Sequence, residues 1–253
     1  MKFRALLALI SFAVVAALPA AEPVPPKPVI IFVHGAWGGA WQFQRVAPLL
    51  EDRGFRVWRA TLTGLGERMH LASPNIGLAT HIDDVANLIR FEDLRDVTLI
   101  GHSYGGMVIT GVADRLPDRI SRLIYLDAAL PVDGESMVNL GKSGGRELLA
   151  KAKDGFIAPW WLRPSKPYPK DVPHPVKTLT DAIQLSNPTA AKIPGSYLLT
   201  VEKGQLAADD DYYPASLRAT ARGWPVIEME GNHNPHWFQP EATVDVLLAA
   251  IRP

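Results

Sequence analysis

Three kinds of side chain in this sequence could together cleave a carboxylic acid derivative: a serine, a histidine and a carboxylate. A serine hydroxyl is a poor nucleophile at neutral pH and needs a base that takes its proton as the new bond forms. Histidine suits this task because its ordinary pKa lies near about 6.5. Ser103 is the central residue of a Gly-x-Ser-x-Gly string, and His233 follows the last predicted strand. We expect Ser103 to be the nucleophile and His233 the base, ahead of His236, which lies further into the same loop.

The carboxylate that would orient the histidine has two candidates. Its task is to accept the imidazole N–H and to stabilise the imidazolium that forms. Glu202 directly follows the predicted strand 196–201, and Asp127 ends the predicted strand 122–126. We favour Glu202 because an acid after this later strand is the commoner arrangement, and we keep Asp127 as the alternative. The acidic run 209–211 is interpreted as a solvated surface segment.

The serine string stands in the sequence context that its chemistry needs. An apolar run, 97–100, precedes it, and a helix-compatible run follows as far as Ala113. A serine at a sharp strand-to-helix turn projects its hydroxyl above the sheet, which is the arrangement called a nucleophile elbow. Gly101 and Gly105 lack a Cβ where the strand and the helix must nearly touch.

Apolar runs alternate with amphipathic segments along most of the chain, which predicts an α/β fold with a mostly parallel sheet and helices on both faces. The expected strands are 29–33, 55–60, 97–100, 122–126, 196–201 and 224–229. The expected helices are 40–53, 81–91, a segment from the elbow to Ala113, 213–222 and 240–251. Glycines after the first strand would let backbone N–H groups approach a ligand, for example a developing oxyanion.

The segment from about 132 to 193 breaks this alternation. Six prolines crowd into its part 159–175, and Trp160 and Trp161 lie among them. Long irregular insertions in compact domains commonly serve as lids, so we expect a small cap over the site. The two tryptophans fit equally well as the core of the cap and as substrate contacts.

Composition excludes several other classes. The 253 residues have a net charge of +0, which gives no electrostatic reason to bind nucleic acid, and the absence of cysteine excludes disulfides and thiolate metal sites. No histidine pair has metal-ligand spacing backed by a carboxylate cluster, and Gly64-x-Gly66 is not a nucleotide-binding loop. We therefore expect no cofactor and no metal.

The first residues stand apart from the rest. Lys2 and Arg4 precede an apolar run, 5–18, which is followed by a small-residue sequence ending at Ala21. This pattern is typical of a bacterial secretory signal peptide. We expect a signal peptide over 1–21, a single domain over 22–253, a periplasmic or secreted location, and no stable membrane insertion after cleavage.

Together these motifs resemble the α/β-hydrolase superfamily, in which nucleophile, acid and histidine follow one another in this chain order. The segments that carry the resemblance are 33–41, 61–68, 101–106 and 125–128. The branch that they resemble contains plant methyl-salicylate esterases, hydroxynitrile lyases and their bacterial esterase relatives. The resemblance implies an oxyanion hole made by the backbone N–H groups of Ala36 and Tyr104. It also implies a substrate pocket lined by Trp37, Tyr104, Trp160 and Trp161.

Two positions depart from the lyases of this branch. Those enzymes carry a threonine after the histidine of the first loop and a lysine after the catalytic histidine, where this chain has Gly35 and Asn234. The branch also usually has aspartate where Glu202 stands. We expect a serine hydrolase that cleaves a carboxylic ester of a small apolar substrate through an acyl-enzyme on Ser103. The alternatives are a lactone or amide hydrolase using the same residues, and a protein that binds a small molecule without turnover.

Overall fold

A six-stranded parallel sheet forms the centre of the molecule. The computed structural model describes residues 27–140, 145–163 and 165–251, so the expected signal peptide lies outside the described residues. The strand order is β2-β1-β3-β4-β8-β9, and every neighbouring pair runs parallel. The strands are β1 Val29–Val33, β2 Arg56–Ala60, β3 Val97–Ser103, β4 Ile120–Ala128, β8 Gly195–Val201 and β9 Val226–Glu230.

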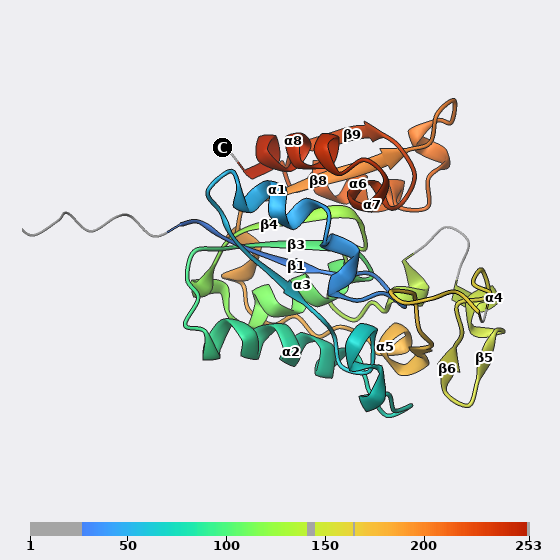
Figure 1. Ribbon diagram of the computed structural model, residues 1–253. Coiled ribbons are helices and arrows are strands. Elements are labelled where there is room, and N and C mark those ends of the chain that lie inside the picture. Colours follow the sequence, from blue (N-terminus) through green and yellow to red (C-terminus); the bar gives the residue numbers. More distant parts are fainter. Residues whose placement is uncertain (1–26, 141–144, 164, 252–253) are drawn as a thin grey trace, which may run out of the picture.

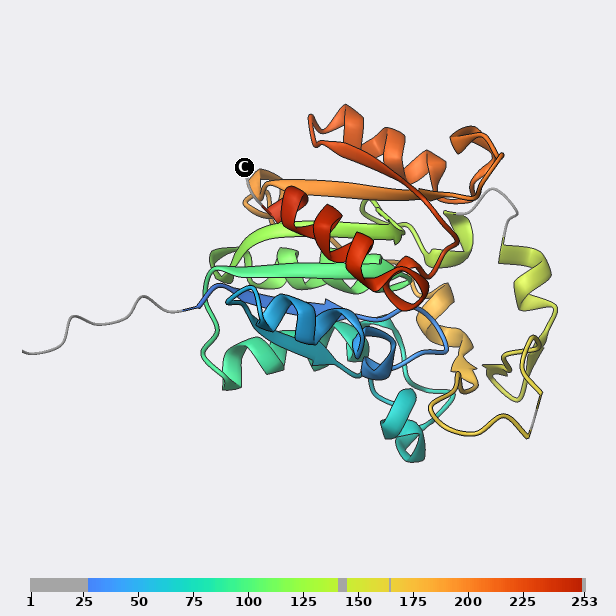
Figure 2. The same ribbon diagram turned by 45° about the horizontal axis from the view of Figure 1, so that its top comes forward.

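Helices cover both faces of this sheet (Figure 1, Figure 2). On one face lie α1 (Val46–Glu51) and α8 (Pro240–Ile251), which share a core with the sheet that includes Phe32 and Leu247. On the other face lie α2 (Leu78–Phe91), α3 (Gly105–Arg115) and α6 (Tyr213–Ala221). All seven residues of β3 are buried, as expected for a central parallel strand covered on both sides. The predicted α/β fold is confirmed.

Short elements connect these layers. The predicted helix 40–53 is divided into a 3₁₀ turn, η1 (Ala40–Phe43), and α1. The other 3₁₀ turns are η2 (Gly66–Leu71), η3 (Pro117–Arg119), η4 (Met137–Asn139), η5 (Ala190–Lys192) and η6 (Ala207–Asp209). A one-turn helix, α7 (Pro235–Phe238), precedes α8.

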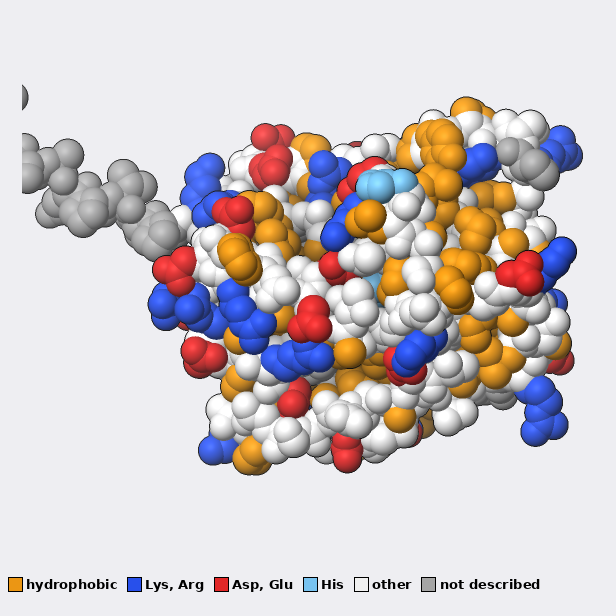
Figure 3. Space-filling view, turned by 90° about the horizontal axis from the view of Figure 1, so that it is seen from below, with side chains coloured by type: hydrophobic (Ala, Val, Ile, Leu, Met, Phe, Trp, Pro, Cys, Tyr) orange, Lys and Arg blue, Asp and Glu red, His pale blue; other side chains and the backbone are white. Residues whose placement is uncertain are grey.

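The segment expected as a cap lies at the end of the sheet where the parallel strands finish, on the right in Figure 1. It contains α4 (Gly145–Leu149), α5 (Val176–Thr180) and a small antiparallel sheet of β5 (Ala152–Lys153), β6 (Phe156–Ile157) and β7 (His174–Pro175). The molecule seen from below shows hydrophobic side chains gathered toward this end, whereas charged side chains are most frequent at the opposite end (Figure 3). On this face of the molecule, apolar side chains are therefore most frequent near the carboxyl ends of the strands.

Candidate active site

Ser103 lies at the end of β3 in a left-handed backbone conformation, with φ of 54°. A serine rarely adopts this conformation outside a strained functional turn. Two glycines make the turn possible. A Cβ on Gly101 would lie 2.7 Å from the carbonyl oxygen of Gly105, and a Cβ on Gly35 would lie 2.9 Å from the Cβ of Ser103. The loop after β1 and the start of α3 thus approach the serine more closely than other residue types would allow.

Asp127 lies near the end of the neighbouring strand, β4, at the register shift between the pairs His102–Leu126 and Ser103–Ala128. Its backbone is also left-handed, with φ of 46°, and its side chain is only 1% exposed. One carboxylate oxygen, Oδ1, accepts a hydrogen bond from the backbone N–H of Thr200 at 3.1 Å. The other, Oδ2, lies 2.6 Å from Nδ1 of His233. Both oxygens are therefore engaged, and the carboxylate fixes the orientation of the imidazole.

The structure brings Asp127, and not the favoured Glu202, into contact with His233. Glu202 lines a surface cleft together with Ser103, Asp127 and His233. Its side chain is exposed, and in the described residues no hydrogen bond or ion pair joins it to His233. The reason lies in the turn at the end of β4. The left-handed turn at Asp127 directs its carboxylate across the end of β8, where it reaches both Thr200 and His233. The carboxylate that contacts the imidazole therefore comes from β4, and Glu202, which follows β8, does not contact it.

His233 is held from a second side by His102. The loop after β9 carries His233, and its carbonyl oxygen accepts a hydrogen bond of 2.7 Å from Nε2–H of His102. The two rings lie 4.5 Å apart. Burial strongly lowers the pKa of His102, which keeps this ring neutral. Both the side chain and the backbone of His233 are therefore fixed by residues from the central strands.

His236, the rival base, lies away from the reacting groups. Its ring is buried between Phe43 and His102, at centroid distances of 4.8 and 4.4 Å. Neither ring nitrogen has a hydrogen-bond partner in the part of the chain that the structure describes. Burial lowers its pKa to about 3, so this histidine stays neutral in neutral solution.

The backbone N–H groups of Ala36, which follows Gly35, and of Tyr104, which follows Ser103, have no acceptor among the described residues. The next N–H along the first loop, that of Trp37, is already used, because it donates to Nδ1 of His174 at 3.1 Å. Trp37 itself has a left-handed backbone with φ of 63°. The loop therefore leaves the N–H of Ala36 unpaired, one residue after the glycine that packs against Ser103, and an oxyanion would require such an unpaired donor.

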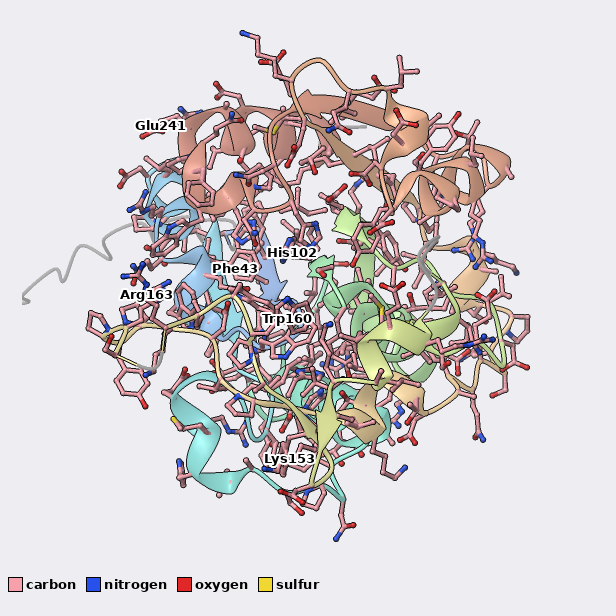
Figure 4. All side chains as sticks on the ribbon, turned by 90° about the vertical axis from the view of Figure 1, so that its right-hand side faces the viewer. Phe43, His102, Lys153, Trp160, Arg163 and Glu241 are labelled. Atoms are coloured by element: carbon pink, nitrogen blue, oxygen red, sulfur yellow. The ribbon has the colours of Figure 1, made fainter. Side chains whose placement is uncertain are left out.

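The aromatic residues divide into two groups. Trp37 and Trp160 line the cleft with Ser103, whereas Trp161 packs edge-on against Trp37 and donates its indole N–H to Asp171. Figure 4 looks onto this end of the molecule and shows Trp160 near the centre of the view. The side chain of Tyr104, expected in the pocket, is fully buried and bonds His81 instead. Its position at the start of α3 turns it into the core.

One residue of the site could not be found from the sequence. The hydroxyl of Tyr212 lies 3.0 Å from Oγ of Ser103, and its ring stacks on His233 with an interplanar angle of 3°. Tyr212 immediately precedes α6, and its backbone N–H donates to Oδ1 of Asp210. Asp210 thus belongs to the turn that positions Tyr212, not to a solvated acidic run. The only pattern in the sequence that could have indicated this role is Asp210, two residues before Tyr212 at the start of the predicted helix.

The chain is similar to proteins of known family. The model of the "Alpha/beta hydrolase family" matches residues 30–246 of the chain. The chain belongs to the alpha/beta hydrolase family. A carbendazim-hydrolysing esterase of Nocardioides sp. (strain SG-4G) is 50% identical over 129 residues, which are 51% of this chain and 53% of that protein. The match therefore spans about half the length of that relative.

Other relatives of this alpha/beta hydrolase align over most of their length. Pheophorbidase of Raphanus sativus is 28% identical over 256 residues, covering 87% of this chain and 93% of the plant protein. Among solved structures, an extracellular alpha/beta-hydrolase of a Paenibacillus species has a TM-score of 0.74 at 23% identity, covering 90% of this chain and 100% of that one. The Arabidopsis methylesterase MES16 has a TM-score of 0.69 at 24% identity, with 88% and 98% covered. The resemblance to plant methylesterases and bacterial esterases is thus confirmed.

The described residues hold neither a metal-binding cluster nor a membrane-spanning helix. Within them, no three or more histidine, aspartate or glutamate side chains are arranged to hold a metal ion. No helix there combines the length and the apolar character that a membrane crossing needs.

Proposed function

We propose that this alpha/beta hydrolase is a carboxylic ester hydrolase in which Ser103, His233 and Asp127 act together. One observation carries the proposal: the 2.6 Å contact between Nδ1 of His233 and the buried carboxylate of Asp127, beside a serine held at a strained turn. A buried carboxylate fixes the tautomer of the imidazole and stabilises the imidazolium that forms during the reaction. The names of the relatives, which are esterases and hydrolases, support the same reaction class.

The reaction then proceeds in two halves. Oγ of Ser103 attacks the ester carbonyl carbon while Nε2 of His233 takes the hydroxyl proton, and the N–H groups of Ala36 and Tyr104 stabilise the oxyanion. The carbon–oxygen bond to the alcohol breaks as His233 returns the proton to the leaving oxygen. Water next attacks the acyl-serine with His233 again as base. The carboxylic acid leaves and Ser103 regains its proton.

Two tryptophans of the cleft wall, which otherwise includes the acidic residues Glu202 and 209–211, support a small apolar substrate. Trp37 and Trp160 offer aromatic surface next to Ser103, and their rings meet at a centroid distance of 5.9 Å. The indole of Trp37 donates its N–H to the carbonyl of Ile157 at 2.8 Å, which joins this wall to β6 of the cap segment. The same three residues could hydrolyse lactones or amides. The assay described below, repeated with a lactone and an amide as substrates, tests these alternatives.

Three variants test the assignment. We expect Ser103→Ala to lower kcat for p-nitrophenyl acetate by about a thousandfold or more, as removal of a triad nucleophile does. Asp127→Asn, which retains the shape of the side chain, should also lower kcat by orders of magnitude, because it removes the charge that stabilises the imidazolium. Glu202→Gln should change kcat by less than about threefold. Circular dichroism and melting curves would show that each variant is folded.

The opposite pattern would reject this assignment. If Glu202→Gln abolishes turnover and Asp127→Asn does not, Glu202 is the acid and the contact seen between Asp127 and His233 is structural. If Ser103→Ala retains the rate of the parent, the acyl-serine mechanism fails. If the folded parent hydrolyses no ester, lactone or amide but binds such compounds, the protein is a small-molecule receptor.

We also propose that the mature protein is periplasmic or secreted. The support is the charged and apolar pattern of residues 1–21. Expression of the full chain in a bacterium, followed by fractionation and mass determination of the N-terminus, tests this. A full-length product confined to the cytoplasm would contradict it.

A further inference from the structure

Two separate hollows adjoin Tyr212. The first is the catalytic cleft of about 590 Å³, which Ser103, Asp127 and His233 line. The second, which we call the side cavity, has a volume of about 170 Å³. Its apolar walls are formed by Ala129, Leu130, Met137, Val138, Leu148 and Ala215. Tyr212 and its neighbour Asp211 are the residues that line both hollows.

The side cavity lies directly beside the nucleophile. The backbone N–H of Ala129, one of its wall residues, donates to the carbonyl oxygen of Ser103 at 3.0 Å. Its one basic wall residue, Arg218, is neutralised by a bidentate pair with Glu135, at 2.5 and 2.8 Å. An apolar cavity of about 150 Å³ in another protein stays dry and binds benzene, so this volume suits one ring or a short alkyl chain.

Tyr212 is held firmly as the wall between these hollows. Its ring lies parallel to the imidazole of His233 at 5.2 Å, and its hydroxyl contacts Oγ of Ser103. Its backbone N–H is bound by Asp210. Burial raises the pKa of the Tyr212 hydroxyl, which therefore keeps its proton and can donate to the serine. In this arrangement the ring separates a substrate bound at Ser103 from the side cavity.

We propose that Tyr212 is the residue that sets the size limit of the substrate, because its ring closes the side cavity off from Ser103. The proposal rests on the proposed esterase function and deepens it. With Tyr212 in place, the ester groups next to Ser103 must be small. Without the ring, the cleft and the side cavity join, and one acyl or alcohol group of phenyl or hexyl size gains an apolar site.

The experiment compares kcat/KM across two ester series. One series has p-nitrophenol as the alcohol and acetate, butyrate, hexanoate or benzoate as the acid; the other consists of acetates of increasingly large alcohols. In Tyr212→Ala we expect the preference for the large over the small member to rise at least tenfold in one series. Each buried methylene group contributes about a fourfold gain in binding, so burial of three or four methylene groups is enough for the expected tenfold rise in preference. The series that responds identifies which group occupies the side cavity.

Matched variants separate the ring from the hydroxyl and the cavity from general loosening. Tyr212→Phe keeps the ring, so its size preference should stay within threefold of the parent. In the Tyr212→Ala background, Ala215→Phe fills the side cavity and should restore the preference of the parent. Ala191→Phe in the same background adds the same side chain at another apolar hollow of about 220 Å³, away from Ser103, and should leave the new preference unchanged.

Two results would overturn the proposal. One is an active, folded Tyr212→Ala variant whose preference stays within threefold of the parent in both series. The other is a folded variant that hydrolyses no ester at all, which would make Tyr212 part of the reaction itself. If Tyr212→Ala does not fold, Tyr212→Val opens the same passage with a smaller loss of packing. Ser103→Ala, assayed in parallel, distinguishes the two proposals. If this variant is as active as the parent, the proposed esterase mechanism is wrong, and the result does not bear on the role of Tyr212.

Discussion

Acidification from pH 7.5 to pH 5 should strongly destabilise this protein, because five of its histidines are fully buried. They are His34, His81, His102, His174 and His236. Burial lowers the pKa of His34 and of His81 to about 4, and that of His236 to about 3. In the unfolded chain each would titrate near about 6.5. Between these values the unfolded chain binds more protons, so the stability is complete above pH 6.5 and is lost as the pH falls.

The magnitude follows from these pKa values. For one histidine with a pKa of about 4 in the folded state, the free energy of unfolding falls by about 2 kcal/mol between pH 7.5 and pH 5. The three histidines with stated values together account for about 6 kcal/mol. The pKa of His102 and that of His174 are also lowered by burial, so they add to the loss. A typical domain has about 5–15 kcal/mol of total stability, so much of it should be lost at pH 5.

Urea unfolding followed by tryptophan fluorescence at pH 7.5, 6 and 5 measures this loss. We expect the midpoint to fall steeply below pH 6.5. His236→Leu removes one titrating group whose ring nitrogens have no partner, so it should reduce the loss by about 2 kcal/mol without lowering the stability at pH 7.5. His70→Gln, at an exposed position, should leave the pH dependence unchanged. Equal free energies of unfolding at pH 5 and pH 7.5 would refute the reasoning.

Three further predictions concern the site and its supports. Gly101→Ala places a methyl group against the first carbonyl of α3 and should lower the free energy of unfolding by about 2–4 kcal/mol, measured by urea; an unchanged midpoint would contradict the close approach. His102→Leu removes the donor to the carbonyl of His233 and should lower kcat by about tenfold with little change in KM; a change in KM alone would speak against this positioning role. Arg218→Gln breaks the bidentate pair with Glu135 and should cost about 1 kcal/mol, a loss that becomes smaller at high salt; a salt-independent loss would indicate packing instead.

The sheet could be predicted from the sequence because its strands are short apolar runs between turn residues. The expected strand 29–33 coincides with β1, and the expected strand 196–201 differs from β8 by one residue. The expected helix 40–53 is interrupted: Gln44 and Arg45 lie between the end of the 3₁₀ turn η1 and the start of α1 and belong to neither. Periodicity alone does not distinguish one helix from two short turns on the same face.

The contacts within the site were harder to predict. Ser103 and its turn are local, since strand, glycines and helix adjoin one another in the chain. The partner of His233 is not local: Asp127 is 106 positions away, and its reach depends on a left-handed turn that no residue-type pattern announces. Tyr212 depends on the same kind of information, because its contact with Ser103 spans 109 positions.

The location of the proposed acid, Asp127, has a consequence for how this enzyme could diversify. The serine and the aspartate both end central, adjacent strands, β3 and β4. The connection from Glu202 to Tyr212 therefore holds none of the three proposed catalytic side chains, although it lines the cleft. Insertions or replacements within residues 202–209 can reshape the mouth of the site without displacing the reacting groups, whereas Asp210 holds Tyr212 against Ser103 and His233. Mutational libraries confined to residues 202–209 should consequently yield altered substrate preferences at a high frequency of active clones.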